Sequence, residues 1–417
     1  MKENSRDIGE PNFDIHKRRA RRKSAERLLL EADICKRNKD LILRYVEYRT
    51  LAENLSVARQ NKYLHYLRIL AENLEKPFDK ATKQDIEKLL GRIYQRDVYR
   101  GRTKKKPSKW TKYDFAVILK TFFKWLKKCE KPKETDWIKP PKPEAPRLRP
   151  DEILTWEDIV KLSKASMNSR DLAFPQVLWE TGARIEELLT LELRDIERVN
   201  NGMALKLHFR KSKTEIRSPI IVRSAPALLN WIEKHPLREY KTAPLWVKIK
   251  RRDKPMDYST ARKILKDLKR RSGLDKPVNP HNFRKSSASF YSHYLSPAEL
   301  KNRYGWRQSS KMLDIYCFPD EERVNGRILE FEGIKERKAK ENAKMKPKKC
   351  VWCGKINPVG VDYCVLCKRP LDPEKNLLAS QLTEIVDDSI REFAEKNSVL
   401  INEFVRFIKR RVEEGMT

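Results

Sequence analysis

Apolar residues recur at helical spacing through the first third of the chain, from residue 29 to residue 129. The clearest stripe consists of Phe115, Ile118, Leu119, Phe122 and Leu126, which occupy positions i, i+3, i+4, i+7 and i+11 of one segment. Residues at this spacing share one face of an α-helix. We therefore expect the aromatic members to belong to a core and not to a platform for nucleic-acid bases, and the segment to be a small helical bundle.

Polar residues at suitable positions predict where several helices begin. Ser56 is a candidate N-cap for a helix with apolar residues on one face, and Thr82 and Asp85 stand three apart before another apolar-periodic stretch. Thr155 and Asp158 repeat this spacing before the sequence IVKLSKAS. A hydroxyl at the N-cap with a carboxylate three residues later satisfies free backbone N–H groups at the start of a helix.

The pattern changes between residues 155 and 330, where helices surround one short β section. The apolar runs ALKLHF and SPIIV flank the polar turn RKSKTEIR, which predicts an antiparallel hairpin. Together the two segments predict a mainly α fold with a small antiparallel β-sheet, of the α+β class. The helices expected in this second segment cover residues 171–180, 185–191, 224–234, 258–271, 282–295, 297–304 and 308–316.

Composition marks the boundaries between these parts. Residues 130–154 form a linker, because they contain six prolines between positions 130 and 150, and proline favours extended backbone. Residues 1–28 carry the run HKRRARRKSAER and are expected to be a basic arm, either solvated or following phosphates. Residues 331–349 are polar and strongly basic, as in a tether.

The last segment, residues 373–417, is predicted to be a long amphipathic helix. Its apolar residues alternate steps of four and three with one asparagine among them, a heptad-like seam that buries against another surface. Packing onto its own chain and oligomerisation both explain this seam. The seam consists of Val386, Ile390, Phe393, Asn397, Leu400, Phe404 and Phe407.

Charge narrows the class of partner. The 417 residues include 93 Lys+Arg against 59 Asp+Glu, a formal net charge of +34. Neutralising phosphates releases counterions, so nucleic acid is the expected partner of such a chain. No run of about 18 apolar residues suits a membrane span, and no charged-then-apolar leader opens the sequence. We therefore expect a cytoplasmic protein that does not span a membrane.

Four of the seven cysteines form two C-x-x-C pairs, CVWC and CVLC, within residues 350–372. Two such pairs suit a tetrahedral zinc ion closed by four thiolates, and the segment resembles a zinc ribbon. A redox-active pair, an iron–sulfur cluster or chance pairing are the alternatives, and the role is either DNA contact or protein docking. The predicted ligands are Cys350, Cys353, Cys364 and Cys367.

Six further residues make up the candidate catalytic set. Arginine matches a phosphate with a planar fork of donors, and a tyrosine hydroxyl can form a covalent intermediate. Two arginines, a lysine, two auxiliary donors and a tyrosine are what metal-free attack on a DNA phosphodiester requires. The six are Arg184, Lys213, His281, Arg284, Trp306 and Tyr316.

Two long stretches carry a family resemblance. The sequence TGARIEELLTLELRDI, residues 181–196, resembles the first box of the tyrosine recombinase family, the phage integrases, which includes the Xer recombinases. The sequence HNFRKSSASFYSHYLSPAELKNRYGWRQSSKMLDIY, residues 281–316, resembles the second box through to the nucleophile. The resemblance covers about residues 29–320 and implies a core-binding (SAM-like) DNA-binding domain over 29–129 and a catalytic domain over 155–330.

The resemblance also implies roles for individual residues. Arg184 and Arg284 correspond to the phosphate-clamping arginines, and Tyr316 corresponds to the nucleophile. Lys213 corresponds to the hairpin lysine that protonates the leaving 5′ oxygen, and His281 corresponds to the histidine of the second box. A sixth position, Trp306, is His in many members and Trp in others.

Two features depart from the common family pattern. Trp306 and Tyr316 stand ten residues apart, one more than expected, which predicts an offset of the tyrosine helix. The residues after Arg284 are KSSAS where many members carry a His-Thr pair, so packing behind the site is expected to differ.

The activity implied is site-specific recombination or integration through a 3′-phosphotyrosyl intermediate. It needs neither ATP nor a metal for catalysis, and it acts on double-stranded DNA as a homo-oligomer, a tetramer in the synapse. A type IB topoisomerase, which relaxes DNA with a similar residue set, is one alternative. A catalytically silent DNA-binding protein on the same scaffold is the other.

Overall fold

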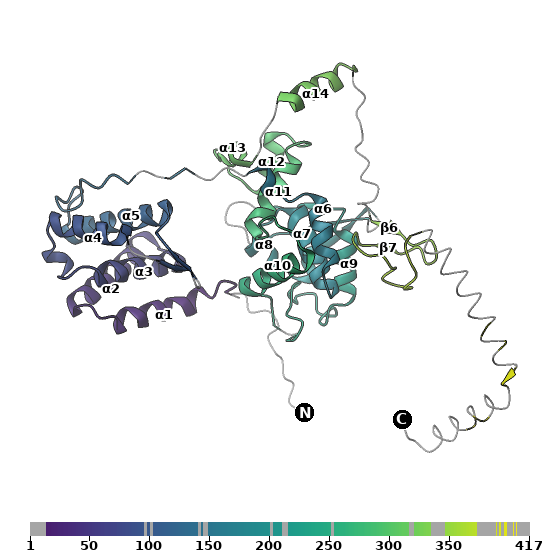
Figure 1. Ribbon diagram of the computed structural model, residues 1–417, viewed down its shortest axis with the longest axis horizontal. Helices are drawn as coiled ribbons and strands as arrows, with labels where there is room; N and C mark the ends of the chain where they lie inside the picture. The colour runs from purple at the N-terminus through teal and green to yellow at the C-terminus, as the bar shows by residue number, and fades with distance from the viewer. Residues whose placement is uncertain are drawn as a thin grey trace. The chain divides into compact units, whose positions relative to one another are not determined.

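The computed structural model divides the chain into two compact units, and each is described by itself (Figure 1). One comprises Glu10–Arg147 with Asp257–Ser259, and the other comprises Leu148–Met256 and Thr260–Thr417 with Met1–Gly9. The residues that the structure describes are 14–95, 98–100, 103–140, 143–144, 149–200, 203–210, 216–251, 254–316, 321–334 and 347–372, with Ser389, Glu392, Lys396, Asn397, Glu403 and Arg406 in the tail.

The first unit is the expected helical bundle. The stripe on its last long helix is confirmed, because Phe115, Ile118, Leu119 and Phe122 are buried and Leu126 packs partly buried against the same core. Its elements are α1 (Arg18–Glu31), α2 (Lys36–Glu53), α3 (Val57–Glu72), the 3-10 helix η1 (Phe78–Lys80), α4 (Lys83–Gln95), β1 (Val98–Arg100), β2 (Thr103–Lys105) and α5 (Lys109–Lys127).

The predicted helix starts are present. The backbone N–H of Thr82 donates to the carboxylate of Asp85 at 2.8 Å, and the N–H of Asp85 donates to the Thr82 hydroxyl at 3.4 Å. Ser56 is the N-cap of α3, but its side chain makes no capping hydrogen bond there. The carboxylate at the third position therefore distinguishes a full capping box from a residue that only precedes a helix.

Two boundaries differ from the sequence interpretation. The chain is helical from Arg18 onward, where an arm to residue 28 was expected, because α1 packs along α3 and buries Leu29. The bundle also extends beyond Cys129, since Ile138 is buried in its core. The extended linker is therefore shorter than residues 130–154.

The second unit is built around α7, which is buried from Arg170 to Thr181 and packs against α6, α9 and α11. Its helices are η2 (Pro150–Glu152), α6 (Trp156–Lys164), α7 (Ser169–Thr181), α8 (Ile185–Leu189), η3 (Leu193–Asp195), α9 (Ala225–Glu233), α10 (Tyr258–Ser272), α11 (Pro280–Tyr291), α12 (Pro297–Tyr304), α13 (Met312–Tyr316) and α14 (Glu321–Phe331).

A three-stranded antiparallel sheet in the order β3-β4-β5 accompanies these helices, so the predicted α+β class is confirmed. The expected hairpin corresponds to β4 (Ala204–Leu207) and β5 (Ile220–Ile221), where Leu205 pairs with Ile221. Strand β3 (Ile196–Val199) was not expected from the sequence. Its side chains are no more than half-buried, so the hydrophobic pattern marks it only weakly.

The predicted Thr155–Asp158 capping box is present at the start of α6. Two helices of this unit differ from expectation. Helix α13 is confined to Met312–Tyr316, and α14 extends to Phe331, one residue past the expected domain end. The cysteine-bearing segment follows with β6 (Lys348–Lys349) and β7 (Ile356–Asn357). The predicted seam of the tail lies, apart from Asn397, outside the described residues.

Candidate active site

Five of the six predicted catalytic residues line one open pocket of about 480 Å³. The sixth, Lys213, lies outside the described residues. None of the described residues that line the pocket is acidic. The structure therefore brings together side chains from α8, α11, α13 and the turn after α12. The lining residues are Arg184, His281, Arg284, Gly305, Trp306, Arg307, Ser309, Ser310, Met312 and Tyr316.

A tight turn places Arg184. Helix α7 ends at Gly182, whose φ of +53° is left-handed, and Arg184 is the N-cap of α8. A Cβ atom on Gly182 would lie 2.3 Å from Cε1 of Tyr304. Both the backbone conformation and the close approach therefore require glycine here.

Arg284 is held rigidly from α11. Its Nη1 donates to the carbonyl oxygen of Gly182 at 2.8 Å, and its Nη2 donates to the carbonyl oxygen of Tyr304 at 2.6 Å. The guanidinium also lies over the rings of Tyr304 and Trp306, at 5.4 and 5.7 Å from their centroids. Burial, with the charges of Arg184 and Arg217, lowers the pKa of Arg284 to about 9, which leaves it charged at neutral pH.

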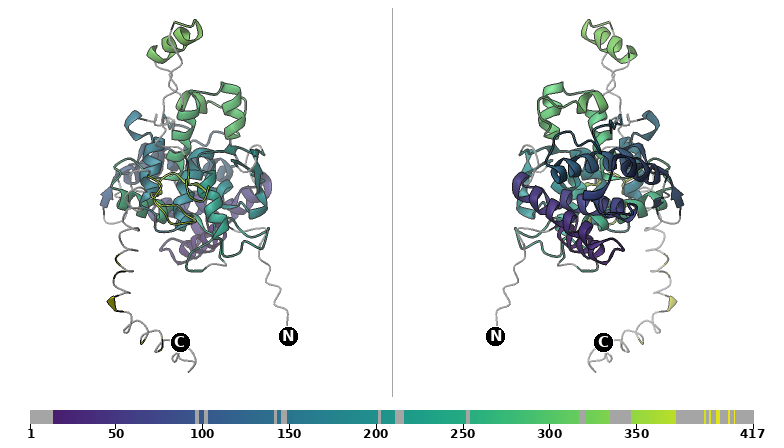
Figure 2. Two further views of the ribbon diagram at one scale, coloured as in Figure 1. Left: turned by 90° about the vertical axis from the view of Figure 1, so that its right-hand side faces the viewer. Right: turned by 90° about the vertical axis from the view of Figure 1, so that its left-hand side faces the viewer.

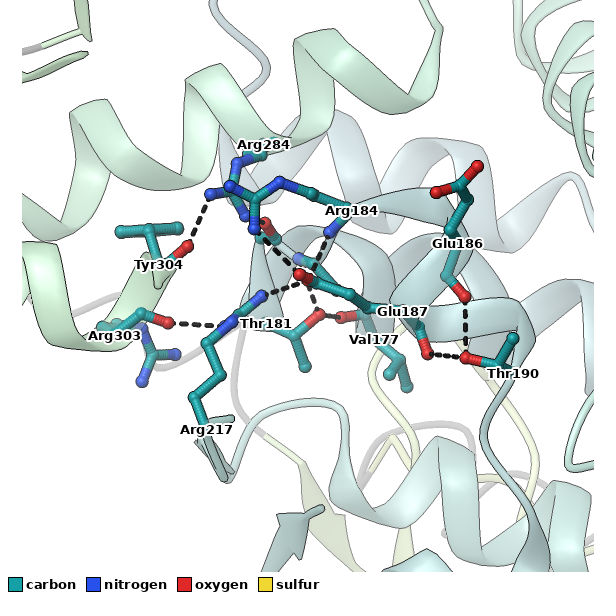
Figure 3. A network of polar contacts seen from close by, with 12 residues as sticks. Val177, Thr181, Arg184, Glu186, Glu187, Thr190, Arg217, Arg284, Arg303 and Tyr304 are labelled. Carbon is teal, nitrogen blue, oxygen red and sulfur yellow. Dashed lines mark hydrogen bonds and ion pairs between the residues drawn. The ribbon is translucent and has the colours of Figure 1, made fainter. Parts of the chain in front are cut away.

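Glu187 is the counter-ion behind the pocket, and the sequence analysis missed it (Figure 3). One carboxylate oxygen accepts from Nη1 of Arg184 at 2.9 Å, and the other accepts from Nη2 of Arg217 at 2.7 Å. The backbone N–H of Arg184 also donates to Glu187 at 2.9 Å, so the same carboxylate satisfies a free donor at the start of α8. The spacing of Arg184 and Glu187 was the available signal, but a glutamate at the third helical position is common on surfaces as well.

Arg217 is the second residue that the sequence analysis missed. Its side chain is 3% exposed, and besides Glu187 it donates to the carbonyl oxygen of Arg303. Burial lowers the pKa of Arg217, and the nearby Glu187 opposes this effect. Arg217 lies three residues before β5 and forms an isolated antiparallel bridge with Phe209, so its contact with Glu187 links this part of the hairpin to Arg184 through a shared carboxylate.

Tyr316 is the last residue of α13 and is 4% exposed. Its ring centroid lies 5.7 Å from that of Trp306 and 6.3 Å from that of His281, and Nζ of Lys285 lies 5.8 Å from it. Burial raises the pKa of Tyr316, while Arg284 and Arg184 act in the opposite direction. Lys285 is a further cation near the hydroxyl-bearing ring that the sequence analysis did not single out.

His281 stands three residues before Arg284 on α11, at the exposed rim of the pocket. Partial desolvation, followed by the charges of Lys285 and Arg284, lowers the pKa of His281 below its ordinary value. The ring is therefore neutral at pH 7 and able to accept a proton.

The arrangement has an excess of positive charge that suits a phosphate. The guanidinium groups of Arg184 and Arg217 pair with the carboxylate of Glu187, and the charge of Arg284 lies close enough to both arginines to be repelled by them. Arg217 is turned toward this carboxylate and toward the protein, whereas Arg184 and Arg284 face the pocket. Fixed donors that need no reorganisation are the arrangement that stabilises charge developing on phosphate oxygens.

A second cluster lies in the segment 347–372, where four cysteine Sγ atoms lie within 4.8 Å of one another. The pairs Cys350–Cys367 and Cys353–Cys364 are separated by 3.6 and 3.5 Å. A tetrahedral zinc ion with bonds of about 2.3 Å requires sulfurs about 3.8 Å apart, so this donor set fits a closed four-thiolate site. The four cysteines can therefore hold a metal ion.

Comparison with known proteins finds a family match that lies mostly in the second unit. Residues 146–323 match the phage integrase family. Tyrosine recombinase XerD of Listeria monocytogenes (strain F2365) is 27% identical over 182 residues, which cover 42% of this chain. The chain spans 60% of the length of that relative. Tyrosine recombinase XerC of Syntrophus aciditrophicus (strain SB) is 25% identical over 265 residues, or 60% of this chain and 83% of the relative.

Solved structures support the same fold. The Tn1549 transposon integrase in complex with transposon right-end DNA has a TM-score of 0.51 and 14% identity, covering 70% of this chain and 99% of its own. A lambda integrase dimer bound to a core site has a TM-score of 0.50 and 18% identity, covering 66% and 76%. The chain thus has a tyrosine recombinase fold. Among its described residues, no helix combines the length and apolar character needed to span a bilayer.

Proposed function

We propose that this protein is a site-specific DNA recombinase that cleaves and rejoins DNA through a covalent bond to Tyr316. The observation that carries the proposal is the convergence of Arg184, Arg284 and Tyr316 on one pocket that has no acidic lining residue among those described. The phage integrase match over residues 146–323 supports it independently. The net charge of +34 suits double-stranded DNA as the substrate.

In the proposed reaction, Arg184 and Arg284 donate to the non-bridging oxygens of the scissile phosphate. The oxygen of Tyr316 attacks phosphorus, a phosphotyrosyl bond forms to the 3′ side, and the bond to the 5′ oxygen breaks. Because the phosphodiester becomes another phosphodiester, its energy is retained and no ATP is needed. The two fixed arginines stabilise the added charge of the transition state.

Two protons must move in this step. His281, neutral at pH 7, takes up the proton of the Tyr316 hydroxyl, directly or through water. Lys213, by the family resemblance, gives a proton to the leaving 5′ oxygen. A 5′-hydroxyl from a partner strand then attacks the phosphotyrosine, releases Tyr316 and completes strand exchange. Both proton roles are assigned from chemistry and resemblance.

We propose an oligomer on DNA as the working form. The similar lambda integrase structure is a dimer bound to a core site, and the Tn1549 integrase structure contains transposon-end DNA. Exchange of strands between two duplexes needs four cleavage events, which predicts a tetramer in the synapse. We also propose a cytoplasmic location with the DNA, and zinc as the metal held by the four cysteines.

A nicked suicide substrate tests the proposal, because loss of a short product strand traps the covalent adduct. We expect a protein–DNA band on a denaturing gel with EDTA present, and we expect Tyr316→Phe to abolish it while DNA binding remains. Tyr294→Phe is the matched control, since Tyr294 is 66% exposed and is not among the residues that line the pocket. An adduct that persists in Tyr316→Phe would refute the assignment of the nucleophile.

The same purified protein and DNA substrates distinguish the recombinase from a topoisomerase and from a catalytically silent DNA-binding protein. Adduct formation with supercoil relaxation, but without recombination of paired sites, would identify a type IB topoisomerase-like enzyme. DNA binding without an adduct on cognate sites would identify a silent scaffold.

A further inference from the structure

The cysteine-bearing segment is packed into the catalytic unit and does not hang from it as a separate domain. Figure 2 (left) shows this segment, coloured yellow, lying over the helices of the unit. Val359 is 4% exposed, and its carbonyl oxygen accepts from Nε2 of Gln176 at 3.0 Å. Gln176 is fully buried in the middle of α7. The amide nitrogen of a buried side chain of the central helix is thus hydrogen-bonded to the cysteine segment, whereas Oε1 of Gln176 has no hydrogen-bond partner among the described residues.

Two neighbouring helices add to this contact. Gly360 has a φ of +92°, and a Cβ atom there would lie 3.5 Å from the carbonyl oxygen of Val160 on α6. Lys355 pairs with Glu233 of α9 at 2.6 Å. Lys164 of α6 also lies 3.8 Å from the carboxylate of Asp362. The segment therefore contacts α6, α7 and α9 through one buried hydrogen bond, van der Waals packing at Gly360 and two ion pairs.

Helix α7 leads directly from this contact to the pocket. Gln176 is followed by the end of the helix at Thr181, the left-handed Gly182 and then Arg184. The carbonyl oxygen of Gly182 also receives one of the hydrogen bonds that fix Arg284. A displacement of α7 along its axis would therefore move the backbone that carries Arg184 and one of the two carbonyl acceptors that hold Arg284.

The segment has little of its own to keep it folded. Its two strands, β6 and β7, have two residues each, and much of its apolar surface is exposed, including Val351 at 79% and Leu366 at 63%. Asn357 makes hydrogen bonds within the segment: its side chain accepts from the N–H of Val365 at 2.8 Å and donates to the carbonyl oxygen of Lys355 at 2.9 Å. Units below about 40 residues usually need a metal or disulfides to fold.

We propose that a metal ion held by Cys350, Cys353, Cys364 and Cys367 is a structural part of the catalytic unit. It keeps the segment 347–372 folded against α6, α7 and α9, and the docked segment in turn holds α7 and the arginines that follow it. Metal loading thereby controls the stability of a site whose own chemistry uses no metal. This inference rests on the proposed metal site, and only its functional consequence rests on the proposed recombinase activity.

The test uses the full chain, with bound zinc measured by mass spectrometry and backbone exchange measured peptide by peptide. We expect about one zinc per chain as purified. Removal by a chelator under reducing conditions should lower the melting temperature and speed hydrogen exchange in residues 169–184 by about tenfold or more. Adding Zn²⁺ back should restore both. Unchanged exchange in residues 169–184 after complete metal loss would overturn the proposal, as would a chain that binds no metal when supplied with Zn²⁺.

A second variant guards against simple misfolding. Gln176→Met keeps the side-chain volume and all four cysteines but removes the hydrogen bond to Val359. We expect this variant to retain zinc, to exchange faster across α7, and to respond less to chelation than the parent. An equal response to chelation in both proteins would contradict the coupling through α7. Because none of these readouts involves DNA, an inactive protein that shows the coupling would refute the recombinase proposal alone.

Discussion

Replacing Glu187 with glutamine removes the counter-ion of the arginine cluster, and the burial of this carboxylate determines how much the free energy of unfolding should fall. The side chains of Glu187 and Arg217 are 2% and 3% exposed, and their ion pair measures 2.7 Å. Glu187→Gln leaves the Arg217 guanidinium buried without a counter-charge. Breaking a buried pair in this way costs about 3–5 kcal/mol of the free energy of unfolding. For a unit of this size that corresponds to a melting temperature lower by on the order of 10 °C.

Thermal and denaturant unfolding of the full chain measure this loss, with Glu186→Gln as the matched control. Glu186 is the adjacent glutamate on α8, and its carboxylate points away from the three arginines (Figure 3). We expect the control to change the free energy of unfolding by less than about 0.5 kcal/mol. In the double variant Glu187→Gln/Arg217→Met the buried charge is gone, so much of the loss should be recovered. Equal losses in Glu187→Gln and Glu186→Gln would refute the reasoning.

The remaining predictions concern the pocket and its pH response. Although burial alone would raise the pKa of Glu187, the net effect with Arg217 and Arg184 is to lower it, so this carboxylate should stabilise the fold above pH 4.5 and lose that effect as pH falls through its folded value. Acid unfolding of the Glu187→Gln variant should accordingly have a shallower pH dependence below pH 4.5. Gly182→Ala should destabilise the second unit by about 3 kcal/mol or more and reduce adduct formation, because of the left-handed φ and the clash with Tyr304. Denaturant unfolding measures this loss, and an unchanged free energy of unfolding would contradict the close packing of Gly182 on Tyr304. Arg284→Lys should slow adduct formation at least about a hundredfold while the melting temperature falls modestly, because an ammonium cannot reproduce the planar contacts to Gly182 and Tyr304. An unchanged single-turnover rate would contradict the proposed role of Arg284 in binding the phosphate. Because the pKa of His281 is lowered, the single-turnover cleavage rate should fall only below about pH 6.5 as the ring becomes protonated, and His281→Gln should remove that fall.

Local chemistry accounts for the features that the sequence predicted well. The Thr82–Asp85 and Thr155–Asp158 boxes are contacts within one turn, so spacing alone specifies them. The stripe on α5 follows from helical periodicity in the same way. The pocket was predicted by the order of motifs, since nothing within residues 181–196 requires proximity to residues 281–316.

Tertiary burial accounts for what the sequence did not reveal. Arg217 is one basic residue in a basic hairpin, and only its 3% exposure and its pairing with Glu187 distinguish it. The segment 18–31 is rich in arginine, and no local sequence pattern predicts that it is a helix. The helix is stabilised by its packing on α3. The cysteine segment accepts a hydrogen bond from Gln176, which lies 183 residues away in the sequence, and no local pattern predicts such a contact.

The shared carboxylate behind the pocket has a consequence for how the protein behaves in ordinary buffers. Glu187 pairs with Arg184 and Arg217, and the charges of these two arginines also act against that of Arg284, so an anion bound in the pocket would relieve repulsion among the three. A ligand that binds only the folded state stabilises it by mass action. Sulfate or inorganic phosphate in a storage buffer should therefore raise the melting temperature and, at the same concentrations, compete with the scissile phosphate. Conditions chosen for shelf life would then be those in which cleavage is slowest.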